Sequence, residues 1–436
     1  MTSSGRQNFE VNSEFGPLTV LLPEFTQEVG NNPKFSFSRF MAQHTMSNYP
    51  GFEVFSEGAH DSELLRRVIR SHLSKGLDSL TVPISDETTF AMSQTFTDRK
   101  DWHAIPLKHM VMEIVVRISS RIFTGPELCR DPEWLEISIQ YTISAMRAVH
   151  ELRRYHPLAR PIMHWCLSSC RVLRRMIKNT RMIMNRAIGN RQLEQHIKGR
   201  IDHNDALEWF EQNAKGQAYD PAITQLVLMF VSAHTTTDLL TQVILDLAKN
   251  QEWIEPLRAE VQAELAKNGR GGFSPHNLKL LDSVIKETQR LKPIGITSMR
   301  RIATETVQLS DGTSIAKGTS LMVLADRHWD HSLYNDANRF QGDRFLRKRA
   351  ERGNDAAASL VGISPNHLGF GYGLHACPGR FFAALEVKIV MCHILLKYNW
   401  KLPVGEDPQP RKIGVFLDSD PVAVVNIQSR DEEVKL

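Results

Sequence analysis

The chain has 436 residues, of which 42% are hydrophobic and 23% are charged. This length can bury a large core, and 25 Gly and 20 Pro residues are too few for a low-complexity chain. The net charge of +4 is too small to indicate a nucleic-acid partner, and five cysteines, an odd and sparse set, argue against a disulfide scaffold.

The N-terminal segment predicts a soluble start and a hairpin. Residues 1–12 (MTSSGRQNFEVN) contain no positively charged stretch followed by an apolar one, so no signal peptide is predicted. The longest apolar stretches, 226–233 and 389–396, are far shorter than the roughly 20 residues of a membrane-spanning helix. Alternating apolar residues interrupted at Gly16-Pro17 predict a small hairpin.

From Ser62 to about Asp282 the apolar period is that of helices. Amphipathic runs are seen in ELLRRVIRSHL, MVMEIVVRISSRIF and EWLEISIQYTISAMRAVHELRR. The segment from Arg153 to Arg191 mixes many Arg and Lys residues with Met, Trp and Leu. Two interpretations stay open for it: a solvated basic helix face, or contact with a membrane surface.

A helix of nearly thirty residues is predicted to begin at Pro221. Its apolar sequence indicates burial, and a polar interruption lies at 232–237. Further on, a hairpin is expected around Asp311-Gly312, then a glycine-rich loop over 365–377 and a last helix from about Pro378. No repeat and no linker is seen, which predicts one mainly α domain with a minor sheet.

The glycine-rich loop carries the strongest chemical signal. Within HLGFGYGLHACPGR (367–380), three alternate glycines, beginning at Gly369, allow positive φ and close approach of backbone to a flat ligand. Cys377 then precedes Pro378, which suits the first turn of a helix. A thiol at a helix N-terminus is expected to have a lowered pKa, as an axial thiolate ligand requires. The alternative is a buried structural cysteine.

The spacing Phe370-x-x-Gly373-x-x-x-Cys377-x-Gly379 resembles the haem-binding loop of the cytochrome P-450 superfamily. The resemblance implies heme b (haem, iron protoporphyrin IX), held by these four residues with Cys377 as the axial iron ligand. It also implies a mainly α P-450 fold in which a long central helix crosses the haem beside small β-sheets. Residues 1–436 are then one catalytic domain.

Glu287 and Arg290 lie three residues apart on a predicted helix, so they share one face and can pair. In the family such a pair is joined by a downstream arginine, and the segment NRFQGDRF matches that place with Arg344. Gly342 and Asp343 stand where the family commonly has Pro and Glu. The resemblance therefore implies a structural lock formed by two guanidinium groups around one carboxylate.

The polar interruption of the long helix matches the family's oxygen site, with His234 and Thr235 in place of the usual acid and threonine. The Thr235 hydroxyl is expected to relay protons to dioxygen. The alternative is that Thr235 to Thr237 bond back to carbonyl groups and bend the helix. For His234, a proton relay and a satisfied core histidine are equally weighted.

The resemblance also places the haem propionates and the substrate. His375 and Arg301 match propionate contacts; Arg300 competes with Arg301, and Arg70 is a third candidate. The stretch with Ile294, Ile296 and Thr297 resembles a substrate-contacting segment and is apolar, as a hydrophobic ligand requires.

Other residue spacings are weaker evidence for a functional site. His328-x-x-His331 and Cys166-x-x-x-Cys170 each offer two metal ligands, but neither has a second pair at zinc spacing, so ordinary packing is expected. No dinucleotide fingerprint follows a strand, so NADPH is expected to act through a separate protein.

The sequence thus predicts a fungal-type haem-thiolate monooxygenase that inserts one oxygen atom of O2 into a hydrophobic secondary metabolite, with a terpenoid preferred. Electrons would come from an NADPH-cytochrome P-450 reductase docked on the basic face behind the cysteine. The alternatives are a redox-neutral rearrangement or dehydration, and an inactive, shortened haem-binding chain. We further expect a monomer without nucleic acid.

The resemblance places the enzyme on the cytosolic face of the endoplasmic reticulum membrane, with peripheral membrane contact. A membrane anchor and a first helix are expected before the first strand, which would span Gly5 to Val11. The chain as given lacks them, which predicts a soluble form.

Overall fold

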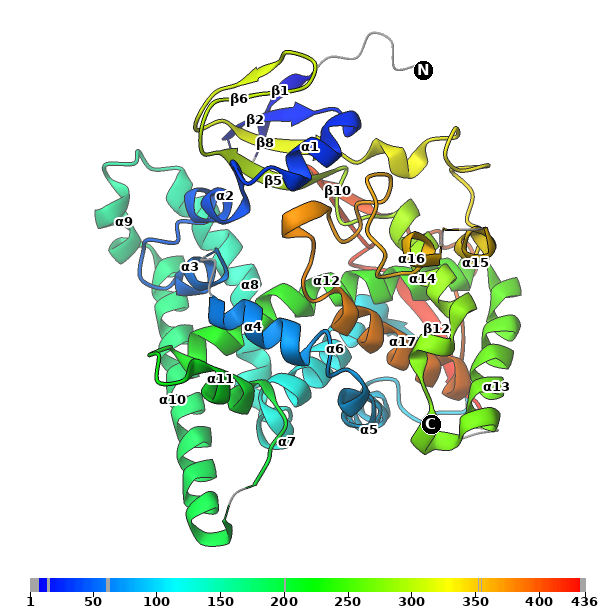
Figure 1. Ribbon diagram of the computed structural model, residues 1–436. Coiled ribbons are helices and arrows are strands. Elements are labelled where there is room, and N and C mark those ends of the chain that lie inside the picture. The colour runs from blue at the N-terminus through cyan, green and yellow to red at the C-terminus, as the bar shows by residue number, and fades with distance from the viewer. Residues whose placement is uncertain are drawn as a thin grey trace. The chain divides into compact units, whose positions relative to one another are not determined.

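Helix α12 (Pro221–Lys249) has the predicted start and length and is the longest apolar helix of the chain (Figure 1). The computed structural model describes residues 8–13, 16–59, 63–199, 201–351, 353 and 355–431. Two compact units are formed. Unit 1 comprises Met1–Ser36, Leu77–Ile114 and Thr235–Leu436; unit 2 comprises Phe37–Gly76 and Val115–His234. The first half of α12 belongs to unit 2 and the second half to unit 1.

The main sheet of unit 1 has the strand order β1-β2-β8-β5-β3 (Figure 1). Its strands are β1 (Phe9–Ser13), β2 (Gly16–Leu21), β8 (Ser320–Leu324), β5 (Thr297–Ala303) and β3 (Phe35–Ser36). The hairpin predicted at Gly16-Pro17 is confirmed, because β1 and β2 pair antiparallel and meet at Gly16. Residues 5–7 of the expected first strand lie outside the described residues.

Three smaller sheets complete unit 1. The second predicted hairpin is confirmed, since β6 (Val307–Gln308) and β7 (Ser314–Ile315) pair antiparallel across Asp311-Gly312. The remaining strands are β4 (His103–Pro106), β9 (Tyr398–Lys401) and β12 (Val424–Ser429) in one sheet, and β10 (Arg411–Ile413) and β11 (Phe416–Asp418) in the other.

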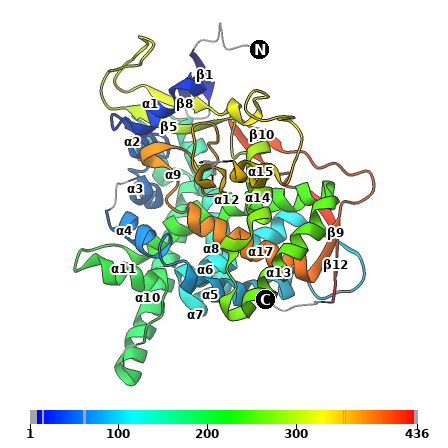
Figure 2. The same cartoon turned by 45° about the vertical axis from the view of Figure 1, so that its right-hand side comes forward.

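Helix α17 (Arg380–Lys397) of unit 1 is buried along almost its whole length, and its sequence is mostly apolar. It lies beside α5, α13 and β9 (Figure 2). It begins two residues later than predicted, because Pro378 and Gly379 remain in the preceding loop. The others are α1 (Thr26–Asn31), α5 (Asp78–Thr95), α13 (Ile254–Gly272), α14 (Lys279–Leu291), α15 (Arg344–Ala350) and α16 (Asp355–Ala358).

Unit 2 is helical, and its two longest helices, α8 (Pro132–Arg153) and α10 (Ser168–Lys198), pack along each other. The Asp131 side chain caps α8 by accepting a 2.9 Å hydrogen bond from the Trp134 amide. The others are α2 (Phe37–His44), α3 (Glu53–Ala59), α4 (Glu63–His72), α7 (Gly125–Leu128), α9 (Arg160–Cys166) and α11 (Ala206–Ala214); α6 (Leu107–Phe123) contributes to both units.

The basic segment 153–191 is amphipathic. α10 buries Leu173, Ile177 and Met184, whereas Ile162 and Trp165 of α9 are exposed. Along the described residues we find no helix that combines the length and the apolar character needed to span a membrane. Predominant helices and small sheets agree with the predicted mainly α class, and the prediction of one domain over 1–436 stays a prediction.

Candidate active site

The cysteine loop is held by contacts that only glycine permits. Gly373 has φ +73°, and a Cβ at this position would lie 2.1 Å from the carbonyl oxygen of Gly30 on α1. At Gly369 a Cβ would lie 2.2 Å from the Gln289 side chain of α14. The φ of Gly369 is not positive, so glycine there serves close packing against the Gln289 side chain and not a left-handed backbone. The loop is therefore fixed between α1 and α14.

Cys377 ends this loop, and its amide donates a 2.8 Å hydrogen bond to the Phe370 carbonyl. Burial raises the pKa of the Cys377 thiol, while the amide groups of Gly379 and Arg380 act in the opposite direction. The predicted effect of the helix terminus is present, because both amide groups lower the pKa, but the loss of hydration outweighs it and the net shift is upward. A bound cation would reverse the balance, since it stabilises a coordinating thiolate.

The remaining loop candidates lie beside the cysteine. Phe370 and His375 are half-buried, and His375 lies in the single turn η5 (Gly373–His375) two residues before Cys377. Gly379 is the N-cap residue of α17. The structure thus brings Phe370, Gly373, His375, Cys377 and Gly379 together in one segment.

Glu287, Arg290 and Arg344 form a buried ion-pair network. Arg290 donates from Nε to Glu287 Oε2 at 2.8 Å and from Nη2 to Oε1 at 2.9 Å. Arg344 donates from Nε to Glu287 Oε1 at 2.9 Å. The Gln341 amide donates to the same oxygen at 3.1 Å. One carboxylate therefore joins α14 to the segment before α15, as charge-assisted bonds allow.

Backbone carbonyl groups accept from the guanidinium N–H groups of Arg290 and Arg344 that do not bond to Glu287. Arg290 Nη1 donates to the carbonyl groups of His328 and Ala337, each at 2.6 Å. The Arg344 guanidinium donates to the carbonyl groups of Asn335, Asp336 and Arg339 at 2.6–3.2 Å. Sequence spacing gave no sign of these carbonyl partners, because the loops that supply them have no regular period.

The metal-like pairs do not form a metal centre. His328 is fully buried whereas His331 is exposed, and Cys170 is buried whereas Cys166 is exposed. No group of three or more His, Cys, Asp or Glu side chains able to hold a metal ion is found among the described residues. Cys377 is therefore considered as the axial ligand of a cofactor.

On α12, Thr235 is exposed although its neighbours Thr236 and Thr237 are buried. Val231, four residues earlier and hence on the same face, is 51% exposed. The Thr237 hydroxyl lies 3.4 Å from the Met112 sulfur rather than bonding back to its own helix. His234 is half-buried and is the last residue of unit 2. α12 thus presents a polar, accessible turn at Thr235.

A second charge network begins one turn after Thr235 and was missed by sequence reasoning. Asp238 forms an ion pair with Lys292 and accepts a 2.7 Å hydrogen bond from the Ser419 amide. Lys108 lies 3.7 Å from Asp238 and 2.5 Å from Asp418. The network links α12, the end of α14 and β11.

The substrate candidates follow Lys292 directly and are held by backbone bonds to the same hairpin. Ile294 accepts from the Leu417 amide at 2.8 Å, and the Ile296 amide donates to Val415 at 3.0 Å. The Ile294 side chain is 40% exposed and Ile296 is half-buried. Thr297 is buried, with its hydroxyl 3.2 Å from the Met322 sulfur, so it faces the sheet core.

The three arginine candidates differ in burial. Arg301 on β5 is only 2% exposed, and burial lowers its pKa to about 10. Its competitor Arg300 is half-buried and lies over the Phe416 ring at 4.4 Å. Arg70 is exposed on α4 of unit 2. Burial therefore favours Arg301 over Arg300 as the partner of a buried anion.

The residues of unit 1 fit the haem that the resemblance implies. A cofactor carboxylate would reverse the unfavourable pKa shift of Arg301, and an iron ion would do the same for Cys377. Glycine at 373 allows the loop to pack directly against the Gly30 backbone.

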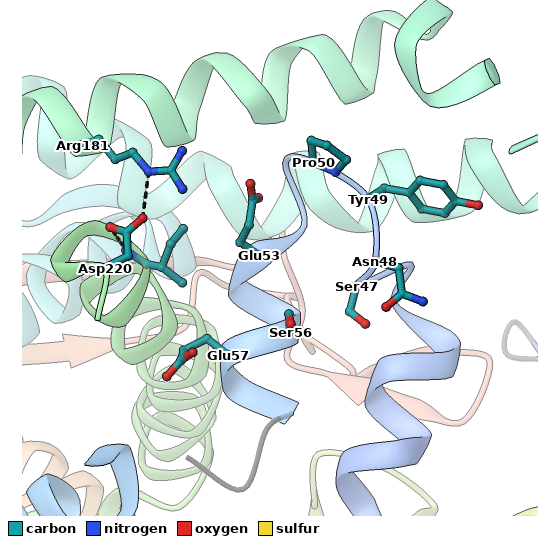
Figure 3. Close-up of a pocket in the computed structure, with 10 residues that line it drawn as sticks. Ser47, Asn48, Tyr49, Pro50, Glu53, Ser56, Glu57, Arg181 and Asp220 are labelled. Atoms are coloured by element: carbon teal, nitrogen blue, oxygen red, sulfur yellow. Dashed lines mark hydrogen bonds and ion pairs between the residues drawn. The ribbon is translucent and has the colours of Figure 1, made fainter. Parts of the chain in front are cut away.

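A cavity of about 440 Å³ in unit 2 has a different character (Figure 3). It lies between the loop before α3, α10 and the start of α12, and its walls carry Glu53, Glu57, Arg181 and Asp220. Asp220 pairs with Arg181 at 2.8 Å and also accepts from the Ala222 amide, and Glu53 accepts from the Gly51 amide. These charges serve local structure, and we assign the cavity no ligand.

Comparisons with known proteins agree with the geometry. The family profile described as Cytochrome P450 matches residues 16–425. Cytochrome P450 monooxygenase 1 of Gibberella fujikuroi is 42% identical over 434 residues, which cover 98% of this chain and 99% of the relative. Cytochrome P450 monooxygenase hepE of Aspergillus oryzae is 43% identical over 426 residues, 96% of this chain and 78% of the relative.

A solved structure supports the fold. The retinoic acid-bound cyanobacterial CYP120A1 aligns with a TM-score of 0.64 at 19% identity, over 86% of this chain and 79% of that one. The mainly α fold with small sheets predicted from the sequence is thereby confirmed.

Proposed function

Because the chain belongs to the cytochrome P450 family and is a monooxygenase of the kind found in fungal secondary metabolism, we propose that it oxidises a hydrophobic secondary metabolite, with a terpenoid skeleton preferred. The family and fold imply haem with an axial thiolate. When bound, haem supplies the activation of O2 and the transfer of one oxygen atom to a C–H bond. The observation that carries the proposal is the cysteine loop fixed between α1 and α14.

The chain's own residues divide the work. Cys377 holds the iron through its sulfur, and the amide groups of Gly379 and Arg380 stabilise the thiolate. Arg301 and His375 hold the propionates, with Arg70 as a further partner. Phe370 shields the sulfur from water, which keeps the thiolate in a site of low dielectric constant.

The Thr235 hydroxyl holds and passes on the proton that O–O cleavage requires. His234, in the place of the family's acid, either feeds that proton or is a core histidine. Ile294 and Ile296 supply apolar wall, and Thr297 supports them from the sheet core.

Electrons come, in this proposal, from an NADPH-cytochrome P-450 reductase docked on the basic face behind Cys377. The enzyme is a monomer of one catalytic domain on the cytosolic face of the endoplasmic reticulum membrane. The exposed apolar side chains of α9 and the basic residues beside them suit peripheral membrane contact, because apolar anchors flanked by cations bind anionic lipid surfaces.

The first test is spectral. Reduced protein with carbon monoxide is expected to give the red-shifted Soret band of thiolate-ligated haem, and Cys377→Ala is expected to abolish it. Cys166→Ala, at an exposed cysteine, is the matched control and is expected to leave the band unchanged. A histidine-type spectrum in the wild type would contradict the assignment.

The second test addresses the reaction. Hydrophobic metabolites that shift the haem spin state are incubated with reductase and NADPH, and products heavier by one oxygen atom are expected. Product formed without reductase or NADPH would instead show a redox-neutral rearrangement or dehydration. Haem binding without any turnover would show an inactive chain.

Thr235 is tested by coupling. We expect Thr235→Ala to consume O2 and NADPH while product formation falls by about 10²-fold or more, because a positioned acid–base group contributes 10²- to 10⁴-fold. Thr235→Ser retains the hydroxyl and is expected to restore coupling. Unchanged coupling in the alanine variant would remove the relay role.

A further inference from the structure

His328 lies in the short helix η4 (Asp326–Trp329) and is completely buried. Its Nδ1 lies 3.1 Å from the carbonyl oxygen of Arg290, at the end of α14. Its Nε2 lies 2.8 Å from the amide nitrogen of Leu368, in the cysteine loop. One imidazole ring therefore touches both the ion-pair network and the loop that ends at Cys377.

The two partners determine the protonation of the ring. A carbonyl oxygen only accepts and an amide N–H only donates, so Nδ1 must carry the hydrogen and Nε2 must be the acceptor. Only the neutral Nδ1–H tautomer of His328 satisfies both bonds. The neutral form is favoured on balance: burial lowers the pKa of His328 to about 4, the bond to the Arg290 carbonyl acts against this, and the cations of Arg290 and Lys286 act with it.

The neighbouring bonds make the connection rigid on both sides. Arg290 returns a bond to His328, since its Nη1 donates to the His328 carbonyl oxygen at 2.6 Å. The His367 ring stacks on His328 with 4.8 Å between ring centroids. Lys286, one turn before Arg290, donates to the carbonyl groups of Ala357, Ser359 and Gly362, all ahead of the cysteine loop.

From Leu368 the path to the sulfur is short. The Leu368 carbonyl accepts from the Gly371 amide at 2.9 Å, and the Phe370 carbonyl accepts from the Cys377 amide at 2.8 Å. Leu368 is itself buried in the core beneath the main sheet. A displaced Leu368 amide would therefore move the turn to which Cys377 is bonded.

We propose that His328 is a positioning residue that couples the Glu287–Arg290–Arg344 network to the cysteine loop through its bond to the Leu368 amide. The part that concerns the iron ligand rests on the proposed haem-thiolate function. The bond itself does not, so the two can fail separately.

Two variants separate the two halves of the ring. In His328→Gln the side-chain oxygen can take the place of Nε2 and accept from Leu368. In His328→Asn the amide can take the place of Nδ1 and donate to Arg290, but nothing reaches Leu368. His331→Asn, at the exposed histidine three residues later, is the matched control.

The first readout is hydrogen exchange of the Leu368 and Cys377 amides in the haem-loaded protein. We expect exchange in His328→Asn to rise by about fivefold to tenfold at both amides, as the loss of one net hydrogen bond would produce. His328→Gln and His331→Asn are expected to stay near the wild type. The second readout is the rate at which the carbon monoxide complex loses its thiolate-type band, with the same ranking expected.

Unchanged exchange at Leu368 in His328→Asn would overturn the proposal. Equal loss in the Asn and Gln variants would also overturn it, since packing alone would then explain the effect. If exchange follows the expected ranking but the wild type shows no thiolate-type band, the proposed function fails and the coupling stands.

If His328→Asn does not fold, a direct measurement on the wild type remains, with His328→Gln needed only for assignment. Nitrogen chemical shifts of ¹⁵N-labelled histidine rings, in the diamagnetic carbon monoxide complex, show which ring nitrogen of His328 carries hydrogen. The His328→Gln spectrum assigns the signal by its loss. Hydrogen on Nε2 would overturn the proposal, and hydrogen on Nδ1 alone would support it.

Discussion

Unit 1 contains two charge networks of opposite design. Around Glu287 one carboxylate meets two guanidinium groups, and these three side chains are 4% exposed or less. Backbone carbonyl groups accept from the remaining guanidinium donors. Around Asp238 the exposed fraction of the charged side chains increases toward the surface: it is 4% for Lys292, 15% for Lys108 and 36% for Asp418. The first network is closed to water and the second opens to it.

This difference matches what each network supports. The closed network is connected to the cysteine loop, whose geometry must not vary, and a fully satisfied buried network favours one arrangement. The open network ties Thr235's helix to the segment that carries Ile294. Charges near water tolerate small displacements at low cost, since solvent replaces part of what is lost. A substrate-binding region benefits from that tolerance.

A single substitution that preserves shape, Glu287→Gln, tests the closed network. Glu287→Gln keeps the shape but leaves Arg290 and Arg344 buried without their countercharge, which is expected to lower the free energy of unfolding by about 3–5 kcal/mol. Urea unfolding followed by circular dichroism measures it. Asp343→Asn, at the exposed pair with Arg347, is the control and is expected to cost less than about 1 kcal/mol. Similar losses in both variants would contradict the contrast.

The two regions are also expected to respond oppositely to pH. His328 stays neutral to about pH 4, whereas in the unfolded chain it binds a proton near pH 6.5. The stability it contributes is therefore present above pH 6.5 and is lost as pH falls toward 4. On α12, burial raises the pKa of Asp246 from 3.8 to about 6. Stability from that carboxyl is therefore lost as pH rises from 3.8 through 6.

Each shift corresponds to about 3 kcal/mol at 1.36 kcal/mol per pKa unit. We would measure the free energy of unfolding from about pH 4 to 7.5. Relative to the wild type, the stability of Asp246→Asn is expected to increase as pH rises, and that of His328→Gln is expected to increase as pH falls. Gln242→Leu removes a bond that lowers the pKa of Asp246, so it is expected to steepen the loss of stability as pH rises. If the stability of all three variants changed with pH in parallel with the wild type, the predicted opposite pH responses would be contradicted.

The open network is expected to show the smallest effect. Asp238→Asn leaves Lys292 without its countercharge and should cost about 2 kcal/mol, whereas Asp238→Asn with Lys292→Met should cost less than the single change. A double-mutant cycle from urea unfolding gives the coupling energy, and Lys249→Met, at the exposed pair with Asp407, is the surface control. A loss of about 3–5 kcal/mol in Asp238→Asn would show that the pair is as closed as the Glu287 network, and a double variant no more stable than Asp238→Asn would show that water already solvates the unpaired Lys292.

Sequence reasoning succeeded where the signal is local. The limits of α12, both hairpins and the pairing of Glu287 with Arg290 follow from periods and spacings within one segment. Arg344 was found only because a family pattern supplied the distant partner.

It failed where the partner is remote. Nothing in the sequence near Asp238 indicates Lys292, because charge complementarity between distant segments leaves no local period. The direction of the Cys377 pKa was missed for a related reason, since the burial that raises it depends on segments packed around the loop. The bond from Leu368 to His328 was equally hidden, and an isolated histidine gave no hint of it.

The close approach of Gly373 to the Gly30 backbone brings together two segments that are far apart in the sequence. During synthesis α1 emerges before the cysteine loop, so the backbone surface against which the loop closes is made before the loop itself. Contacts of such large sequence separation form slowly, because the intervening chain must be ordered first. We therefore expect haem capture to be a late event in maturation, and shortening the chain past Gly30 to prevent it even when Cys377 and its neighbours are intact.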